Sequence, residues 1–197
     1  MAYPIVEAPY GFKPINRLDG MPYAGAVRHV KIASGYAVNI FNGDLVIVAT
    51  AGVAQKFTGT TTGSPAGVFV GCEYTDPVTK QKLRSQYWPT GTVAADAVAF
   101  VVDDPAAAFK VAVTDGSSDM ADAARAAIGA NMSVVQGTGS TDTGNSAMSV
   151  LAGSEGTTAA LPIRVLDVVT DTATDADEFV ELIVKINLHQ YNNTTGV

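Results

Sequence analysis

Short apolar segments separated by turn residues recur along almost the whole sequence, and they constrain the fold more than any other feature. Segments such as VRHVKI, GVFVGCEYT, FKVAV and LPIRVLDVV are rich in β-branched residues, and loops such as TGTTTGSP and GTGSTDTGNS separate them. Many short strands spaced by turns are typical of barrels and sandwiches. We therefore predict a mainly β protein, with a small antiparallel β-barrel or a sandwich as its architecture.

The positions of the turn residues predict three strand pairs. The first turns at Asn42-Gly43, the dipeptide most favoured in tight hairpins, although a sharp bend between barrel strands at Gly43-Asp44 remains an alternative. The second joins GVFVGCEYT to KLRSQYW through a turn that begins at Asp76. The third joins AVAFVVDD to FKVAV around Asp104.

One helix and a C-terminal strand complete the expected elements. We expect the helix over about 118–128, because SSD offers capping residues, MADAARAAI contains strong helix formers and Gly129 supplies a stop. In the last strand, alternation predicts one apolar face and one polar face, with Ile183 as the exception. The apolar face is expected to carry Leu182, Val184, Ile186 and Leu188, and the polar face Glu181, Lys185, Asn187 and His189.

Residues 1–24 differ from the rest of the chain and form an expected N-terminal arm. Four prolines in this stretch exclude a helix and disfavour a central strand. The stretch is nevertheless apolar and aromatic, so we expect it to lie extended on a surface, which is either its own body or another subunit. Residues 25–197 are then expected to form a single β-rich domain.

Composition excludes several classes of function. The net charge of -7 argues against nucleic acid as the main partner, since phosphate binding needs a basic surface. Only 16% of the residues are charged, against about 25% in typical proteins, which suits a chain that buries surface against a partner. The first residues do not resemble a signal peptide and no apolar run could span a bilayer, so we expect folding in a cytoplasm and no membrane partner.

The sequence contains only weak candidates for catalytic or metal-binding residues. The lone Cys72 lies in an apolar run and is expected to be buried, and Ser154 lies in an imperfect copy of a nucleophile motif. His29 and His189 lie in separate expected strands, and the acidic stretch 171–178 lacks the ligand spacing of a calcium loop. We therefore expect no enzyme activity, no metal and no cofactor.

Tyr87 and Trp88 form the most conspicuous aromatic cluster. Core packing is the first interpretation, and an exposed contact for a neighbouring subunit or a sugar is the alternative, because aromatic residues are enriched in interfaces.

Several segments together resemble structural proteins of tailed bacteriophages, and most of all their head decoration, or cement, proteins. These segments are APYGFKPIN, IASGYAVNIFNGDLV, GVFVGCEYTDP with SQYWP, AFVVDDPAAAFKV and VKINLHQYNNTTGV. The resemblance covers nearly the whole chain and consists of turn glycines and apolar strands. It implies a small β-barrel or β-tulip-like protein that binds the outer face of the expanded capsid, commonly as a homotrimer.

The resemblance also implies a function and a set of contacts. The chain would stabilise the head by bridging subunits of the phage major capsid protein, and it would be located in the virion after synthesis in the bacterial host cytoplasm. The expected capsid contacts in the arm are Tyr3, Pro4, Tyr10, Phe12, Lys13, Pro14 and Arg17, with Tyr87 and Trp88 as a possible subunit interface. The alternatives are a tail or head–tail joining protein, and a glycan-binding surface module.

Overall fold

The fold is mainly β, as predicted from the sequence. The computed structural model describes residues 6–114, 125–169 and 179–192. In the described ranges the strands are β1 (Lys13–Arg17), β2 (Arg28–Ile32), β3 (Ile40–Phe41), β4 (Leu45–Ala49), β5 (Val53–Lys56), β6 (Gly67–Thr75), β7 (Lys82–Ser85), β8 (Tyr87–Trp88), β9 (Val98–Val102), β10 (Ala107–Thr114), β11 (Asn131–Met132), β12 (Val134–Val135), β13 (Ser149–Leu151), β14 (Ile163–Val168) and β15 (Glu181–Ile186), and a short 3-10 turn follows at Gln190–Asn192.

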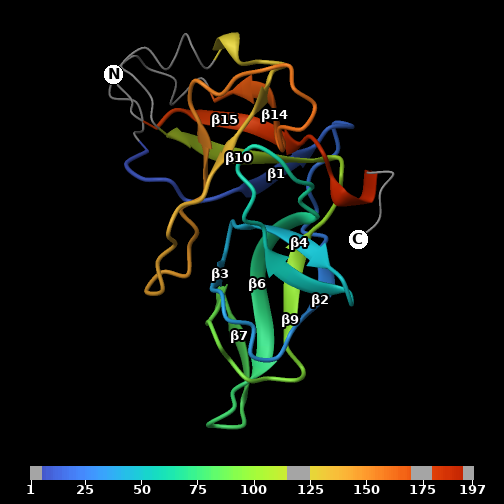
Figure 1. The fold of residues 1–197 in the computed structure, drawn as a ribbon, viewed down its shortest axis with the longest axis vertical. Helices are drawn as coiled ribbons and strands as arrows, with labels where there is room; N and C mark the ends of the chain where they lie inside the picture. Colours follow the sequence, from blue (N-terminus) through green and yellow to red (C-terminus); the bar gives the residue numbers. More distant parts are fainter. Residues whose placement is uncertain (1–5, 115–124, 170–178, 193–197) are drawn as a thin grey trace.

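Strands β2, β4, β5, β6 and β9 close into a barrel, which we call the first barrel (Figure 1). The hydrogen-bonded order is β4-β5-β2-β9-β6, and β6 pairs again with β4 to complete the circle. All pairs are antiparallel except β2 with β5. β7 extends β6 beyond the circle, and β3 pairs with β8 as a separate two-stranded ribbon.

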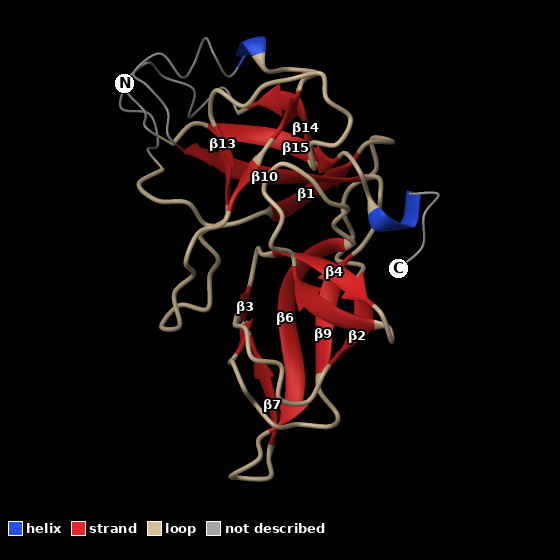
Figure 2. Cartoon of the chain, in the orientation of Figure 1, coloured by secondary structure: helices blue, strands red, loops and turns tan. Residues whose placement is uncertain are grey.

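The remaining strands form a second barrel, drawn above the first in Figure 2. β10 is its central strand, with β15 on one edge and with β1 and β13 on successive halves of the other. The segment 131–135 pairs through β11 with β14 and through β12 with β13, so it connects the two ends of the sheet. A closed arrangement satisfies the strand edges that an open sheet would leave unpaired.

The two barrels are nested in the order of the chain. Residues 28–102 carry every strand of the first barrel, whereas the second barrel uses β1 and then β10 to β15. β1 and β10 are antiparallel neighbours whose ends meet, since Arg17 pairs with Ala107 and Leu18 N donates to Ala106 O at 2.8 Å. In the sequence, the whole first barrel is therefore an insertion between two strands that are neighbours in the second barrel.

Two buried apolar clusters correspond to the barrels, and one of them extends across both. The interior of the first barrel takes side chains from all five of its strands, among them Val30, Val46, Ala54, Phe69 and Val101. The other cluster fills the second barrel, and it also includes four buried side chains of the first barrel region, which are Leu45, Phe57, Val68 and Val102. Apolar burial of this kind is the main favourable term in folding, so the shared cluster joins the two barrels into one body.

Two of the three predicted strand pairs are wrong, and one is confirmed. β6 and β7 form the hairpin expected around Asp76. Asn42-Gly43 is not a hairpin turn, since β3 pairs with β8 while β4 pairs with β5 and β6, and the alternative of a sharp bend at Gly43 (φ 100°) is confirmed. β9 and β10 are not paired either, because the chain passes from the first barrel to the second near Asp104.

The expected helix at 118–128 lies largely outside the described residues, which resume at Arg125. Gly129 has a positive φ of 85°, the conformation favoured at a helix stop, and its amide donates to Val165 O. The C-terminal strand is confirmed over Glu181–Ile186, with Leu182, Val184 and Ile186 buried on one face of β15. Leu188 follows the end of the strand and is half-buried, so the predicted apolar face stops one residue earlier in the alternation.

Candidate functional site

The described part of the N-terminal arm lies on its own body, which answers the question that the sequence left open. β1 adds to the edge of β10 with antiparallel pairing. Before it, Gly11 N donates to Met148 O at 3.1 Å and Phe12 N donates to Gly43 O at 2.9 Å. The arm therefore contacts β10, the start of β13 and the bend before β4.

Phe12 is a core residue and has no exposed surface. Its ring packs edge-to-face on Phe109 of β10, with the ring centroids 6.5 Å apart. The sequence predicted Phe12 as a capsid contact, and the structure corrects this, because a fully buried side chain is not available to a partner while the chain keeps this fold.

Tyr10 is held by a charged pair rather than presented to solvent. Its hydroxyl donates to a carboxylate oxygen of Glu181 in β15, and Lys110 of β10 forms an ion pair with the same carboxylate at 2.9 Å. Burial, followed by the hydrogen bond to Glu181, raises the pKa of Tyr10 well above its usual value. The sequence treated Glu181 as a residue of the polar face of its strand, but it is buried beneath the arm.

The other arm residues named from the sequence also have partners in the same chain. Lys13 donates to the side-chain oxygen of Asn42 at 3.3 Å, and Pro14 lies opposite Phe109 in the β1–β10 pair. Arg17 forms ion pairs with Asp19 and with Asp104, at 3.1 and 3.2 Å. Tyr3 and Pro4 lie outside the described residues.

Trp88 is buried in the interior of the first barrel, where it packs edge-to-face on Tyr74 and donates from its indole nitrogen to Tyr36 O at 3.1 Å. Tyr87 is half-buried and stacks on Phe41. The core interpretation of this cluster is confirmed for Trp88, which therefore cannot serve as a subunit contact or as a stacking platform for a sugar.

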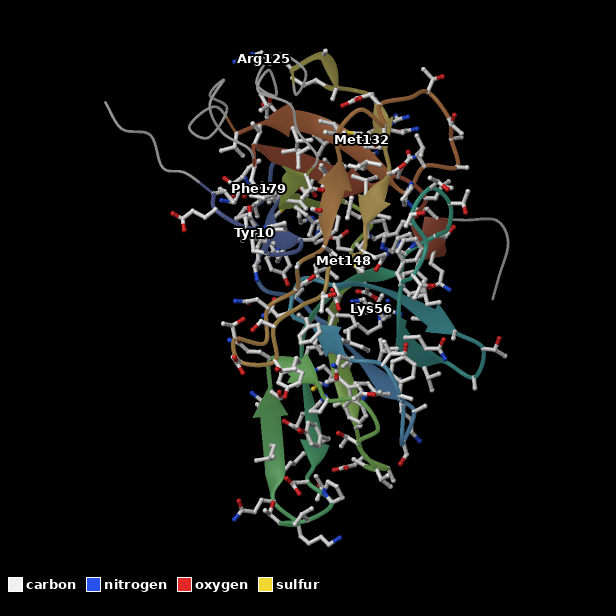
Figure 3. The ribbon with its side chains drawn as sticks, turned by 60° about the vertical axis from the view of Figure 1, so that its left-hand side comes forward. Tyr10, Lys56, Arg125, Met132, Met148 and Phe179 are labelled. Carbon is white, nitrogen blue, oxygen red and sulfur yellow. The ribbon has the colours of Figure 1, made fainter. Side chains whose placement is uncertain are left out.

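A group of buried polar contacts lies at the junction between the barrels, and it centres on Asp44. This side chain is fully buried, and its Oδ2 accepts from Phe41 N at 2.8 Å and pairs with Lys56 Nζ at 3.1 Å. Ser146, from the loop before β13, donates to Oδ1 at 2.6 Å. Met148 of the same segment accepts a hydrogen bond from Leu45 N through its sulfur. Figure 3 shows Met148 and Lys56 at the level where the barrels meet.

Two glycines allow the arm to pass close to this junction. Gly11 and Gly43 both have positive φ, and a Cβ atom on Gly11 would lie 2.7 Å from Gly43 O. A real Cβ atom does not approach a backbone oxygen so closely, so this contact requires glycine. From the sequence, Gly43 was expected in a hairpin turn with Asn42 or, as the alternative, in a sharp bend with Asp44, and no buried charge was predicted there. An acidic residue inside the apolar run IFNGDLVIV is the signal that could have predicted a buried charge.

The C-terminal segment returns from the second barrel to the first. The side-chain amide of Gln190 accepts a hydrogen bond from Val48 N at 2.9 Å through its oxygen and donates one to Val48 O at 2.7 Å through its nitrogen. This side chain therefore pairs with the main chain of β4 much as a neighbouring strand would. His189 beside it is buried, and its Nδ1 accepts from Tyr191 N. Burial lowers the pKa of His189, and the nearby carboxylate of Asp104 opposes that effect.

The remaining candidates from the sequence have structural environments. Ser154 donates to Leu151 O and accepts from Ser133 N, so its hydroxyl stabilises a turn. Cys72 is buried as expected, and burial raises the pKa of its thiol to about 12. His29 is exposed on β2, 4.8 Å from the Phe100 ring. The acidic stretch 171–178 lies outside the described residues.

Among the residues of the described ranges, three or more His, Cys, Asp or Glu side chains never gather as a group that could hold a metal ion. No helix formed by them is long and apolar enough to cross a membrane. No protein-family model, curated protein sequence or solved structure matches the chain.

Proposed function

We propose that this chain is a non-enzymatic structural protein of a tailed bacteriophage, which binds the outer surface of the capsid and stabilises the expanded head by bridging subunits of the major capsid protein. The proposal rests on the resemblance of its segments to head decoration proteins. A homotrimer on the outside of the virion is the form that the resemblance implies.

The observation that carries the proposal is the joining of the two barrels into one body. A clamp that offsets outward pressure on a shell has to resist deformation between its own parts. Here the parts share an apolar cluster, a buried Asp44–Lys56 pair and the main-chain contacts of the arm. Close-packed interiors of this kind have low compressibility, so force applied to one barrel is transmitted to the other.

The role of the arm in this proposal differs from the capsid contact that was expected from the sequence. Because Phe12 is fully buried and Tyr10 is bonded to Glu181, we assign these two residues to the stiffness of the clamp. Lys13, Pro14 and Arg17 keep part of their surface exposed, and their contact with the capsid stays a prediction. The capsid contacts then belong to the exposed surface of the barrels. An interface of standard size buries roughly 800 Å² on each partner, which a body of this size can offer.

Copy number in purified virus particles tests the proposal. Quantitative mass spectrometry would compare this chain with the major capsid protein. We expect a ratio of one or of a simple fraction, because a clamp repeats with the shell lattice. A few copies per particle would assign the chain to the tail or the head–tail joint instead, and absence from the particle would refute the proposal.

A further inference from the structure

The C-terminal strap, which we define as residues 189–192, connects the end of the second barrel to the first barrel. It follows β15 after two residues, and Figure 2 shows its 3-10 turn beside the junction of the two barrels. Gln190 N donates to Pro65 O at 2.9 Å, and the Gln190 side chain is bonded to both main-chain groups of Val48. The strap therefore belongs to the second barrel by sequence and to the first barrel by its contacts.

The strap covers a part of β4 that has no strand beside it. β4 pairs with β6 only through Leu45 and Val46, and Val46 O accepts from Ala66 N on that edge. Val48 lies two residues farther along the same edge, where Gln190 takes the place of a strand. Without the strap, this edge of β4 would offer unpaired main-chain groups to other chains.

His189 holds the strap in its turn, and it does so only as a neutral side chain. The ring is 2% exposed, its Nδ1 accepts from Tyr191 N at 3.2 Å, and the Tyr191 ring lies 5.4 Å away. A ring nitrogen that accepts a hydrogen bond carries no proton, so this geometry assigns the proton to Nε2. Protonation of His189 would place a second hydrogen on Nδ1, opposite the Tyr191 N–H, and would bury a charge.

The groups around the imidazole ring do not compensate for that charge. Burial has the largest effect and lowers the pKa of His189, whereas Asp104, between β9 and β10, and the main chain of Ala66 raise it. Arg28 of β2 lowers it further. These charged neighbours already form ion pairs, Arg17 with Asp104 and Arg28 with Asp103.

We propose that the strap is a pH-sensitive latch, in which protonation of His189 releases residues 189–192 from the first barrel and uncovers the edge of β4. Release is local because His189 is the one buried residue of the strap, while Tyr191 and Asn192 are exposed. The shared apolar cluster and the Asp44–Lys56 pair do not involve the strap, so the barrels stay joined. This inference does not depend on the proposed function.

Hydrogen exchange of the full-length protein, followed by NMR at pH 7.5 and pH 5.5 and corrected for the intrinsic chemical rate, tests the latch. The amides of Val48 and Gln190 should open several-fold more often at pH 5.5. The increase should not exceed about tenfold, because pH 5.5 lies about one unit below the ordinary histidine pKa. In dilute urea their opening should stay constant, since release of the strap exposes little surface, whereas opening of Val184 in β15 should increase.

Three variants make the test specific. His189→Gln should remove the pH effect on Val48. His29→Gln is the matched control, because His29 is the other of the two histidines and is exposed on β2, and this variant should keep the pH effect. Gln190→Ala should lower the protection of Val48 at both pH values, which verifies that this amide reports on the strap.

The latch is refuted if Val48 of the wild type opens equally often at both pH values. A pH effect that persists in His189→Gln would belong to another group, such as Asp103, and would also refute it. Opening of Val48 that rises with urea in parallel with Val184 would show global unfolding in place of local release, and the inference would again fail.

Discussion

At the scale of single residues, the junction depends on a few polar groups that have no access to water. Asp44 satisfies its carboxylate with an amide, a hydroxyl and an ammonium group, supplied by Phe41, Ser146 and Lys56. A buried charge with all its partners is tolerated, but the same charge without one of them is strongly destabilising. The protein is therefore sensitive at these positions to changes that keep the volume of the side chain.

Replacing Lys56 by Met should lower the free energy of unfolding by about 3 to 5 kcal/mol, because it leaves the Asp44 charge buried without its counter-ion. Urea denaturation measures this change. Lys31→Met on exposed β2 is the control and should change the free energy of unfolding by less than about 0.5 kcal/mol. Equal effects of the two substitutions would mean that the buried pair does not stabilise the junction.

His189 should make stability depend on pH. Its pKa is lowered in the folded state, so the unfolded chain binds the proton more readily. The stability that depends on neutral His189 is complete above the ordinary pKa of about 6.5 and is lost as the pH falls from there toward the lowered value. Asp104 and Arg28 act on the same ring in opposite directions.

The check is urea denaturation of the wild type and of His189→Gln at pH 7.5 and at pH 5.5. The wild type should lose more stability than the variant between these two values. Asp103, whose pKa burial raises, is present in both proteins and cancels in the comparison. Equal losses in the two proteins would contradict the prediction.

At the scale of elements, β1 behaves as a strand supplied to a body that is incomplete without it. It covers half of one edge of β10, and Phe12 before it fills part of the core. An uncovered edge strand offers unpaired main-chain groups to other chains, which favours aggregation. The composition of the arm predicted an apolar, extended segment that lies on a surface, and the position of the arm agrees with this part of the sequence-based prediction.

Removal of residues 2–17 should therefore lower the melting temperature and cause aggregation, since loss of Phe12 alone costs about 3 to 5 kcal/mol. A synthetic peptide of residues 6–18 should restore part of the stability by pairing with β10. The same peptide with Phe12→Ala should restore much less. Thermal unfolding followed by light scattering measures both effects, and a truncated protein with the stability of the wild type would contradict this role of the arm.

Local signals in the sequence predicted strands better than they predicted the partners of strands. The β6–β7 hairpin was predictable because its turn and both strands are contiguous in the chain. The turn at Asn42-Gly43 carries an equally strong hairpin signal, yet β3 pairs with β8 and β4 with β5 and β6. The decisive contact there is the burial of Asp44 against Lys56 and Ser146, and no local pattern in the sequence brings these residues together.

At the scale of the whole molecule, the shared cluster makes the two barrels depend on each other. Leu45, Val68 and Val102 belong to strands of the first barrel but lie in the cluster that fills the second. Separation of the barrels would expose these side chains to water at a cost of roughly 25 cal/mol for each Å² of apolar surface.

We therefore expect one cooperative thermal transition, with equal calorimetric and van't Hoff enthalpies. Leu45→Ala in the shared cluster and Val30→Ala inside the first barrel should each lower the temperature of that single transition. Differential scanning calorimetry is the measurement. Two resolved transitions, with Val30→Ala shifting only one of them, would show that the barrels unfold separately.

The nested order of the barrels also bears on how such a protein could arise. β1 and β10 meet at their ends, with Leu18 bonded to Ala106, so the first barrel enters and leaves the second at one point. New sequence is accepted most readily where its two ends lie close together at the surface. An ancestral chain with a simple turn between these two strands could have gained a complete lobe there by a single insertion, without any change in the pairing of the older strands.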